Sequence, residues 1–255
     1  MGIYEQFSLK HKVAVVTGAG RGIGRGIAIA FAEAGADVAV IARRQADLDE
    51  VVGVVESLGC RGLAIACDVT EGTAIPDALD RVVTTFGQLD IMVNNAGGNP
   101  DRKAVPVAET SLERWDDVLS LNMRHKFWGA SNAARRMLDG GRIINVVSRA
   151  AYAPTPGFAA YAAGNAGIIS MSVTMAIELA PRGITVNCIA PGAVYTDLVK
   201  GSRPGTAEEM QASTTLAAPL GRLGKPEDIA AAALYLASPA AEWITGQCIR
   251  VSGGR

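Results

Sequence analysis

Seven short runs of apolar residues recur along the chain, and most of them are unbroken by polar residues. The runs cover residues 13–16, 38–41, 63–66, 91–93, 143–147, 184–189 and 249–251. An unbroken apolar run is typical of a strand that is buried on both faces, as in a parallel sheet covered by helices. The pattern therefore predicts a parallel sheet of about seven strands.

Stretches with helical periodicity separate these runs, at residues 23–34, 46–58, 74–86, 112–138, 159–179 and 226–236. Alternation of strands and helices implies right-handed crossovers. We therefore expect an α/β fold, a Rossmann-type doubly wound parallel sheet flanked by helices. No linker, repeat or low-complexity tract interrupts the pattern, so residues 1–255 are expected to form a single domain.

Several residues mark helix ends. Thr110 and Glu113 have the spacing of a capping box before the 112–138 helix. Gly35 and Gly59 follow the first two helices, where a left-handed C-cap would sit. Pro226 suits the first turn of the last helix.

Composition narrows the class of protein. Hydrophobic residues make up 49% of the 255 residues and charged residues 19%, which favours a sizeable core over disorder. The net charge is −1 without a long run of one sign, so neither nucleic acid nor an anionic membrane is expected as a partner. The N-terminus lacks a secretory layout and no apolar stretch looks long enough to span a bilayer, so a cytoplasmic location is expected.

The residues that could hold a metal are scattered. They are Cys60, Cys67, Cys188 and Cys248, with His11 and His125. The cysteines form no CxxC pair, so we expect no metal site and interpret them as buried free thiols.

A glycine-rich turn follows the first predicted strand and opens the first helix. Residues 17–24 read TGAGRGIG, with Gly18, Gly22 and Gly24 placed to turn the backbone tightly. Free N–H groups at a helix N-terminus favour a negative charge, so this turn predicts a pyrophosphate site. The alternative is a tight strand–helix turn that binds nothing, but its place in a βαβ unit favours the dinucleotide.

Further motifs extend this observation over nearly the whole chain. They include Asp68-Val69 after the third strand, the NNAG sequence of residues 94–97, Pro191-Gly192 with Thr196, and the glycine-rich tail of residues 245–254. Asn122, Ser148 and Tyr161 complete the set. Together with the TGxxxGIG turn, the chain resembles the short-chain dehydrogenase/reductase family, and 3-oxoacyl-carrier-protein reductases within it.

The resemblance implies roles for particular residues. The implied catalytic residues are Asn122, Ser148, Tyr161 and Asn165. The expected cofactor contacts are Gly18, Arg21, Gly22, Ile23, Gly24, Arg43, Arg44, Asp68, Val69, Asn94, Ala96, Gly97, Tyr161, Asn165, Pro191, Gly192, Val194 and Thr196. Ser148 would bind the substrate oxygen, Tyr161 would pass the proton, and Asn122 would support a water relay.

The end of the second predicted strand indicates which nucleotide binds. An acid at this place would accept the ribose hydroxyls of NAD and repel the phosphate of NADP. The sequence has Ala42 there, followed by Arg43 and Arg44, and Arg21 lies in the glycine turn. Arginine suits a 2′-phosphate, so we expect NADP(H) to be preferred over NAD(H). The alternative is a pair of solvated surface arginines.

Position 165 departs from the family pattern, in which a lysine there holds the ribose and lowers the tyrosine pKa. Asn165 can hydrogen-bond a ribose hydroxyl but carries no charge. If the tyrosine pKa rises from about 7 to about 10, its ionised fraction at neutral pH falls roughly 1,000-fold. Alcohol oxidation, which needs a base, should therefore suffer more than carbonyl reduction, which needs an acid.

Four interpretations of Asn165 stay open. The chain is a native reductase that tolerates asparagine, an engineered lysine-to-asparagine variant, a pocket for a reaction without net redox, or a cofactor-binding protein without turnover. The joint presence of Asn122, Ser148 and Tyr161 favours the first two. Lys126 and Arg149 are candidate substitute cations, but both are interpreted first as solvated side chains.

The remaining expectations concern the substrate and partners. Residues 195–216 could form a mobile lid, residues 99–106 the opposite wall, and residues 153–158 an apolar wall. We therefore expect an NADP(H)-dependent oxidoreductase acting on a small or medium, fairly apolar carbonyl or alcohol. The rival is a nucleotide-binding module with little or no redox activity. The resemblance also implies a homotetramer or dimer.

Overall fold

A single seven-stranded parallel sheet organises the molecule, with the strand order β3-β2-β1-β4-β5-β6-β7. The structure, a computed structural model, describes residues 2–99, 101, 103–153, 155–196 and 218–254. The strands are β1 (Val13–Thr17), β2 (Asp37–Ala42), β3 (Gly62–Ala66), β4 (Ile91–Asn94), β5 (Arg142–Val146), β6 (Thr185–Pro191) and β7 (Cys248–Val251). The predicted doubly wound, Rossmann-type fold is confirmed.

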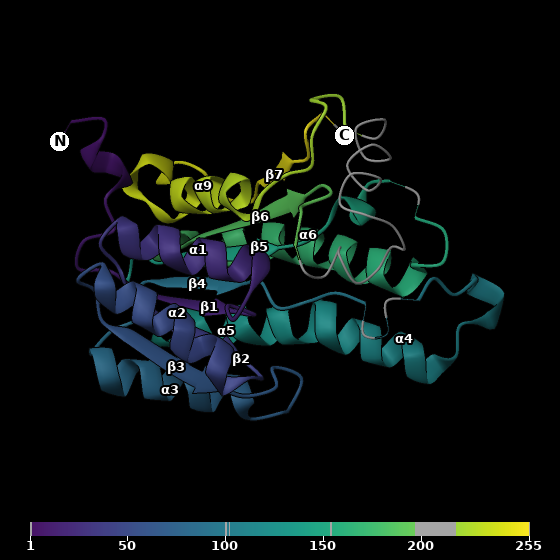
Figure 1. The fold of residues 1–255 in the computed structure, drawn as a ribbon, viewed down its shortest axis with the longest axis horizontal. Helices are drawn as coiled ribbons and strands as arrows, with labels where there is room; N and C mark the ends of the chain where they lie inside the picture. Colours follow the sequence, from purple (N-terminus) through teal and green to yellow (C-terminus); the bar gives the residue numbers. More distant parts are fainter. Residues whose placement is uncertain (1, 100, 102, 154, 197–217, 255) are drawn as a thin grey trace.

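Helices cover both faces of this sheet (Figure 1). The helices are α1 (Gly22–Glu33), α2 (Gln45–Ser57), α3 (Ala74–Phe86), α4 (Leu112–Leu119), α5 (His125–Arg136), α6 (Ala159–Leu179) and α9 (Pro226–Ala237). Helices α1, α2 and α9 pack on one face, and α3, α5 and α6 pack on the other. The chain thus forms the three-layer arrangement that a parallel sheet requires.

The unbroken apolar runs reflect burial on both faces of the sheet. In β1, Ala14 and Val16 belong to the core under α1 and α9, whereas Val13 and Val15 belong to the core under α3 and α5. All five residues of this strand are buried. Successive side chains of a strand point to opposite faces, so both faces here need apolar residues.

The strand order reverses at β1, which has β2 on one side and β4 on the other. The chain leaves β1 toward α1 on one face and leaves the adjacent β4 toward α5 on the other face, which opens a crevice at the carboxyl ends of these two strands. Ligands of open α/β sheets bind at such a crevice.

One long helix predicted from the sequence is divided in three. Residues 112–138 form α4, a π-helical segment (Ser120–Arg124) and α5, which ends at Arg136. In the π segment, the N–H of His125 donates to the carbonyl of Ser120, five residues before it. Such π segments occur frequently at functional sites.

The expected capping box is also wrong by one residue. The N-cap of α4 is Ser111, whose side chain accepts a hydrogen bond from the N–H of Arg114 at 3.2 Å. Thr110 instead donates from its hydroxyl to the carbonyl of Pro106 at 3.0 Å. The other end signals are confirmed: Gly35 and Gly59 have φ values of 97° and 83°, and Pro226 is the first residue of α9.

Two expectations about composition need correction. The four cysteines are free, but only Cys188 is buried, and the other three are half-buried. The segment Ala159–Arg182 is long and apolar enough to cross a bilayer by length and composition, with a mean hydropathy of 1.3. In the fold its helix, α6, packs against β6, α4 and the π segment, and 33% of the apolar window is buried.

Candidate active site

A cavity of about 950 Å³ lies at the carboxyl ends of the strands. Its wall includes most of the residues predicted to bind a cofactor: Gly18, Arg21, Gly22, Ile23, Gly24, Arg43, Arg44, Asp68, Val69, Ala96, Gly97, Pro191, Gly192, Val194 and Thr196. Asn122, Ser148 and Tyr161 line the same cavity. The fold thus joins the glycine turn and the predicted reaction centre in one continuous space.

The glycine turn has the geometry that a bound pyrophosphate requires. Gly18 and Gly22 adopt φ values of 66° and 56°, which favour glycine. A Cβ on Gly24 would lie 2.3 Å from the carbonyl oxygen of Gly18 and 2.5 Å from Nδ2 of Asn95, so no side chain fits there. Glycine is required at this position because the turn packs tightly.

The start of α1 faces the cavity without a side-chain cap. Arg21 occupies the N-cap position in extended backbone and makes no side-chain hydrogen bond to the first turn. The first N–H groups of a helix need a partner, and together with the helix dipole they attract an anion. This part of the site therefore fits the pyrophosphate of a dinucleotide.

Of the two asparagines at the end of β4, Asn94 was expected to contact the cofactor, but Asn95 lines the cavity. The Asn95 side chain lines the cavity and donates to the carbonyl oxygens of Thr17 and Gly18 at 2.9 and 3.3 Å. Asn94 is fully buried away from the cavity wall and donates to Oδ1 of Asn145 at 2.9 Å. The expectation that the Asn94 side chain contacts the cofactor is therefore not supported, and sequence reasoning missed Asn95.

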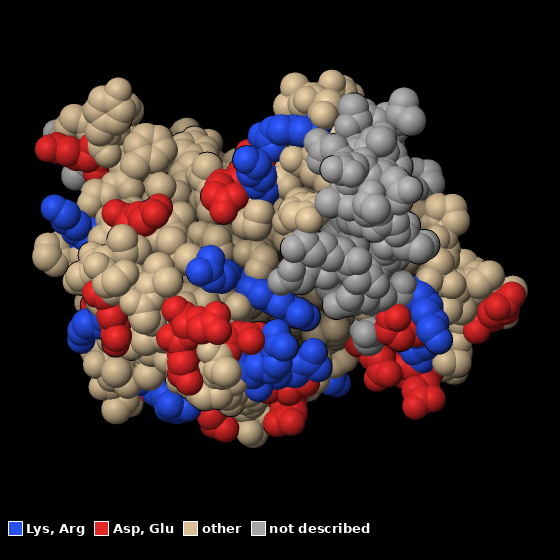
Figure 2. Space-filling model, in the orientation of Figure 1, with Lys and Arg blue, Asp and Glu red and all other residues tan. Residues whose placement is uncertain are grey.

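At the end of β2, two arginines follow a residue with a small side chain. Ala42 lines the cavity, and Arg43 and Arg44 follow it with exposed side chains. Arg44 forms an ion pair with Asp47 of α2, whereas no carboxylate of the described residues lies within ion-pair distance of Arg43. Figure 2 shows Lys and Arg side chains gathered on the face where α1 begins and β2 ends.

Asp68 lies in the cavity wall after β3 with its carboxylate held in place. Its Oδ1 accepts hydrogen bonds from the N–H and the hydroxyl of Thr70 at 2.9 and 2.7 Å. Burial acts to raise the pKa of Asp68, but these hydrogen bonds and the nearby charge of Arg43 lower it below its usual value. The group is therefore an anion at neutral pH.

Ser148 and Tyr161 face the cavity from neighbouring elements. Ser148 caps a short 3₁₀ turn (Arg149–Ala151) after β5, and its hydroxyl accepts from the N–H of Ala150 at 3.2 Å. Tyr161 lies in the first turn of α6. Burial raises the pKa of the Tyr161 phenol, while Ser148 and the Asn165 amide act in the opposite direction. The phenol is therefore protonated at neutral pH and can donate a proton.

Asn165 does not line the cavity. It is 1% exposed, and its Nδ2 donates to the backbone carbonyl of Tyr161, one turn earlier in the same helix, at 2.8 Å. Its Oδ1 is buried and has no hydrogen-bond partner among the described residues. The contact expected between Asn165 and a ribose is therefore not supported, because the amide turns back onto its own helix.

The side chain of Asn122, in the π segment, hydrogen-bonds the loop that follows β4. Its Oδ1 accepts from the N–H of Gly98 at 2.9 Å, and its Nδ2 donates to the carbonyls of Gly98 and Val118 at 2.7 and 2.8 Å. Both hydrogens of the amide are thus engaged. The side chain fixes the loop after β4 to the helix rather than offering free donors to a relay.

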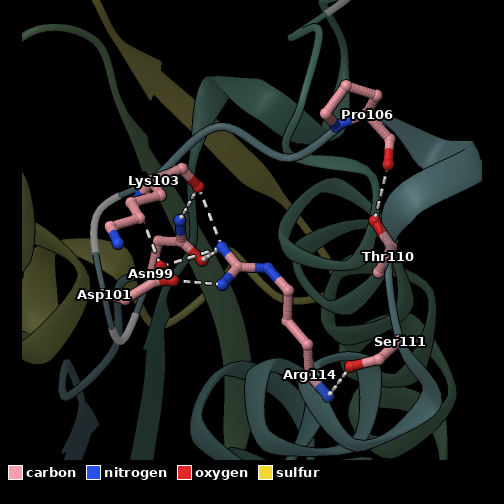
Figure 3. A network of polar contacts seen from close by, with 7 residues as sticks. All are labelled: Asn99, Asp101, Lys103, Pro106, Thr110, Ser111 and Arg114. Carbon is pink, nitrogen blue, oxygen red and sulfur yellow. Dashed lines mark hydrogen bonds and ion pairs between the residues drawn. The ribbon is translucent and has the colours of Figure 1, made fainter.

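Residues 99–106 were expected to form a wall of the cavity, but none of their described residues lines it. A polar network ties this loop to α4, as Figure 3 shows. Arg114 of α4 pairs with Asp101, and its Nη2 donates to the carbonyl of Lys103 at 2.8 Å. Hydrogen bonds from Arg114 lower the pKa of Asp101 to about 2, so the ion pair persists over the physiological range. At the far end of the loop, Val105 donates its N–H to the carbonyl of Gly157 at 2.9 Å. Residues 197–216 of the expected lid lie outside the described residues.

Lys126 is the residue that sequence reasoning placed wrongly. It was expected to be solvated, yet it is 2% exposed and lines the cavity. Its Nζ donates to the carbonyl of Val146, the last residue of β5, at 2.6 Å. Arg149, the other candidate cation, is half-buried and is not part of the cavity wall. The four-residue spacing from Asn122 was the available signal for Lys126.

Comparisons with known proteins cover almost the whole chain. Residues 18–255 match a family model described as enoyl-(acyl carrier protein) reductase. The chain is 39% identical to the 3-oxoacyl-(acyl-carrier-protein) reductase FabG of Vibrio cholerae over 249 residues, which are 97% of this chain and 98% of the relative.

Two solved structures extend the similarity to the fold. One is a 7α-hydroxysteroid dehydrogenase complexed with NADH and 7-oxo glycochenodeoxycholic acid, with a TM-score of 0.92, 36% identity and coverage of 100% of this chain and 98% of that chain. The other is a short-chain dehydrogenase from Burkholderia cenocepacia in complex with NADP, with a TM-score of 0.88, 36% identity and coverage of 96% and 98%. Both the sequence and the fold are thus similar to those of nucleotide-dependent oxidoreductases.

Proposed function

The chain belongs to the short-chain dehydrogenase/reductase family of oxidoreductases, and from that membership we propose that it uses NADP(H) to reduce a carbonyl compound or to oxidise the corresponding secondary alcohol. One observation carries the proposal: Ser148 and Tyr161 line the same cavity as the glycine turn at the start of α1. A proton donor and a nucleotide site in one cavity are what hydride transfer to a carbonyl needs.

The described residues divide the binding of the nucleotide among them. The glycine turn and the first turn of α1 would hold the pyrophosphate, and Asp68 and Val69 would border the adenine. The bound nucleotide supplies or accepts the hydride at its nicotinamide. Asn122 contributes by fixing the loop that contains Gly97 and Gly98 in the cavity wall.

Ser148 and Tyr161 perform the proton chemistry. In reduction, the Ser148 hydroxyl donates a hydrogen bond to the carbonyl oxygen and polarises it. The Tyr161 phenol gives its proton to that oxygen, which becomes the hydroxyl of the product. In oxidation the same phenolate takes the proton back, and the raised pKa of Tyr161 favours the reductive direction at neutral pH.

The preference for NADP(H) rests on the end of β2. Ala42 leaves room and brings no negative charge, and Arg43 has no carboxylate partner among the described residues. Asp47 and Asp68 are acids in the cavity wall near these arginines: Arg44 forms an ion pair with Asp47, and the charge of Arg43 acts on Asp68. A 2′-phosphate would therefore gain a charge-assisted contact with Arg43.

Dissociation constants for NADPH and NADH test this preference. The wild type should bind NADPH more tightly, and Arg43→Ala should weaken NADPH binding by about 10- to 100-fold, the scale of a hydrogen bond to a charged group. NADH binding should hardly change. Arg61→Ala is the matched control, because Arg61 lies outside the cavity wall and pairs with Asp37. Tighter binding of NADH by the wild type would reject the preference.

The substrate class follows from the wall beyond the nicotinamide end. Leu121, Val147 and Val194 contribute apolar surface to this wall, and its polar groups include Ser148, Tyr161 and Lys126. We therefore propose a small or medium, fairly apolar ketone or secondary alcohol. A panel of ketones that differ in polarity, assayed with NADPH, tests it; turnover confined to charged ketones would contradict it.

The assembly is proposed to be a homotetramer or dimer. Large apolar side chains stay exposed on two neighbouring helices: Phe127 and Trp128 on α5, and Val173 and Ile177 on α6. Exposed apolar surface of this kind marks a contact with another protein surface. Light scattering coupled to gel filtration should give the mass of two or four chains, and a monomer at micromolar concentration would contradict it.

A further inference from the structure

Lys126 is a buried cation without a carboxylate partner. It is among the largest buried side chains, with an exposed fraction of 2%, and no ion pair of the described residues includes it. Burial lowers its pKa to about 8, so it still carries its charge for most of the time at neutral pH. A buried charge is costly unless it is paired or serves a function. The position of its ammonium group indicates which function.

The ammonium lies between the carboxyl ends of β4 and β5. It donates to the carbonyl of Val146, two residues before Ser148. On the other side, a Cβ placed on Gly97 would lie 3.4 Å from Nζ of Lys126 and 3.0 Å from Oδ1 of Asn122. Nζ is thus directed to the part of the cavity wall from which Ser148 extends.

The helix that carries Tyr161 packs against the segment that leads to Lys126. A Cβ on Gly164 would lie 3.4 Å from Cβ of Asn122, and one on Gly167 would lie 3.1 Å from the Met123 side chain. Residues 122–126 therefore bridge α6 and the ends of the strands. This packing holds Lys126 and Tyr161 in walls of the same cavity.

The ammonium group has donors to spare. A lysine has three N–H donors, and the Val146 carbonyl is the acceptor recorded for Lys126 within the described part of the chain. The other cations in the described cavity wall are Arg21, Arg43 and Arg44, which are exposed and lie at the phosphate end. Lys126 therefore supplies the buried positive charge near the reaction centre.

We propose that Lys126 is the positioning residue that brings positive charge to the Ser148–Tyr161 end of the cavity and stabilises the ionised Tyr161 phenolate. The inference rests on the proposed function, in which Tyr161 exchanges a proton with the substrate. Residue 165 brings no positive charge, because Asn165 is neutral, although its amide also acts to lower the Tyr161 pKa. A cation near an acid favours the charged form of the acid and lowers its pKa.

The titratable groups around Lys126 are few in the described structure. Cys188 of β6 interacts electrostatically with it. His125 precedes it on α5, and burial together with the charge of Lys126 lowers the pKa of that imidazole to about 3, so His125 is neutral. Tyr161 lies on α6 in the same cavity. A change in the pH profile on removing Lys126 therefore reports on Tyr161 or on Cys188, and Cys188→Ala separates the two.

The first experiment measures the pKa of Tyr161 directly. The protein is labelled with ¹³Cζ-tyrosine, the Tyr161 signal is assigned with Tyr161→Phe, and the nucleotide-free and NADPH-bound forms are titrated. Lys126→Met and Lys126→Gln should each raise the Tyr161 pKa by about 1–2 units, which is a 10- to 100-fold loss of phenolate. Lys126→Gln can keep a donor for the Val146 carbonyl, so it separates charge from hydrogen bonding. Lys103→Met, an exposed lysine, is the control and should change nothing.

The second experiment adds a lysine at position 165, first in the wild type and then in the Lys126→Met variant. Under the proposal, Asn165→Lys adds a second cation to a site that already has one, so alcohol oxidation should rise less than about threefold. In the Lys126→Met background the same substitution should restore most of a 10- to 100-fold loss, and the basic limb of the pH–rate profile should return to its wild-type position.

Opposite results overturn the inference. An unchanged Tyr161 pKa in both Lys126 variants, or a gain above about 30-fold from Asn165→Lys alone, means that Lys126 brings no useful charge to Tyr161. Failure of the proposed function would give a different result. The wild type would bind the nucleotide and reduce no ketone, while the Lys126 variants would still change the Tyr161 pKa.

Discussion

The two ends of the cavity were built by different means. At the phosphate end, backbone groups make the site: the glycine turn and the uncapped start of α1 present N–H groups, and Gly24 leaves no room for a side chain. At the reaction end, side chains make the site, and Asn122, Lys126 and Asn165 take orientations that depend on their neighbours. A site made of backbone is specified locally, whereas a site made of side chains is specified by packing.

The largest expected effect is at the reaction end. Tyr161→Phe removes the proton donor, and general acid catalysis contributes about 10²–10⁴-fold, so carbonyl reduction should fall about 1,000-fold. The dissociation constant for NADPH should change less than threefold, because the phosphate end is untouched. Tyr152→Phe, which alters an exposed tyrosine outside the cavity wall, is the control for steady-state assays. Equal losses of turnover and NADPH binding would contradict the division into two ends.

The phosphate end should respond in the opposite way. Gly24→Ala places a Cβ against the carbonyl of Gly18, so the turn must open. We expect NADPH affinity to fall about 100-fold and the free energy of unfolding to fall by about 1–3 kcal/mol. Gly53→Ala, in the interior of α2 with nothing within 4 Å of the added methyl group, is the matched control and should stabilise the protein by about 0.5–1 kcal/mol. Calorimetry measures both, and normal affinity in Gly24→Ala would show that the turn is not the binding site.

The buried charge of Lys126 should lower the free energy of unfolding, whereas Gly24 is needed for stability. Its pKa is about 8 in the fold against 10.5 for the ordinary side chain, so the unfolded chain binds more protons between these pH values. The cost is complete below about pH 8 and disappears as the pH rises to 10.5. Lys126→Met should therefore be more stable than the wild type by about 1–3 kcal/mol at pH 7, and the difference should shrink toward pH 10.5. Denaturant titrations at several pH values measure it, and a gap that widens with pH would contradict the assignment.

The smallest expected effect concerns the loop of residues 99–106, which continues from Gly97 and Gly98 of the cavity wall. Arg114→Met removes the ion pair with Asp101 and the bond to the Lys103 carbonyl, so the loop loses its fixed position. Because the pair is exposed, we expect the KM for the ketone to rise only about two- to fivefold, with kcat nearly unchanged. Arg61→Met breaks a similar ion pair with Asp37 at the other end of the sheet and should leave KM unchanged. A fall in kcat without a change in KM would contradict a positioning role for the loop.

The difference between a site made of backbone and a site made of side chains also explains what the sequence could predict. The seven strands followed from unbroken apolar runs, because burial on both faces removes the polar positions. The glycine turn followed from its spacing, because only glycine tolerates the close approach at residue 24. Both features are local consequences of sterics, and a single segment is enough to state them.

The side-chain end could not be predicted in the same way. Asn165 was expected in the cavity, but a short amide at this position bonds the carbonyl of Tyr161 in its own helix. Lys126 was expected in solvent, because lysine is rarely buried, and its burial depends on the Val146 carbonyl of a strand that comes later in the chain. The π segment that contains Asn122 left no mark in the apolar periodicity. Each case depends on a neighbour that the sequence pattern does not identify.

One assay tests the central claim most directly, that the phosphate end and the Tyr161 end act together in a single oxidoreductase site. NADPH consumption is followed spectrophotometrically with a panel of apolar ketones, for the wild type and for Tyr161→Phe, at a nucleotide concentration that saturates both. We predict ketone-dependent consumption by the wild type and a loss of about 1,000-fold in the variant. Saturable NADPH binding with no consumption for any ketone, or equal rates in the two proteins, would contradict the account.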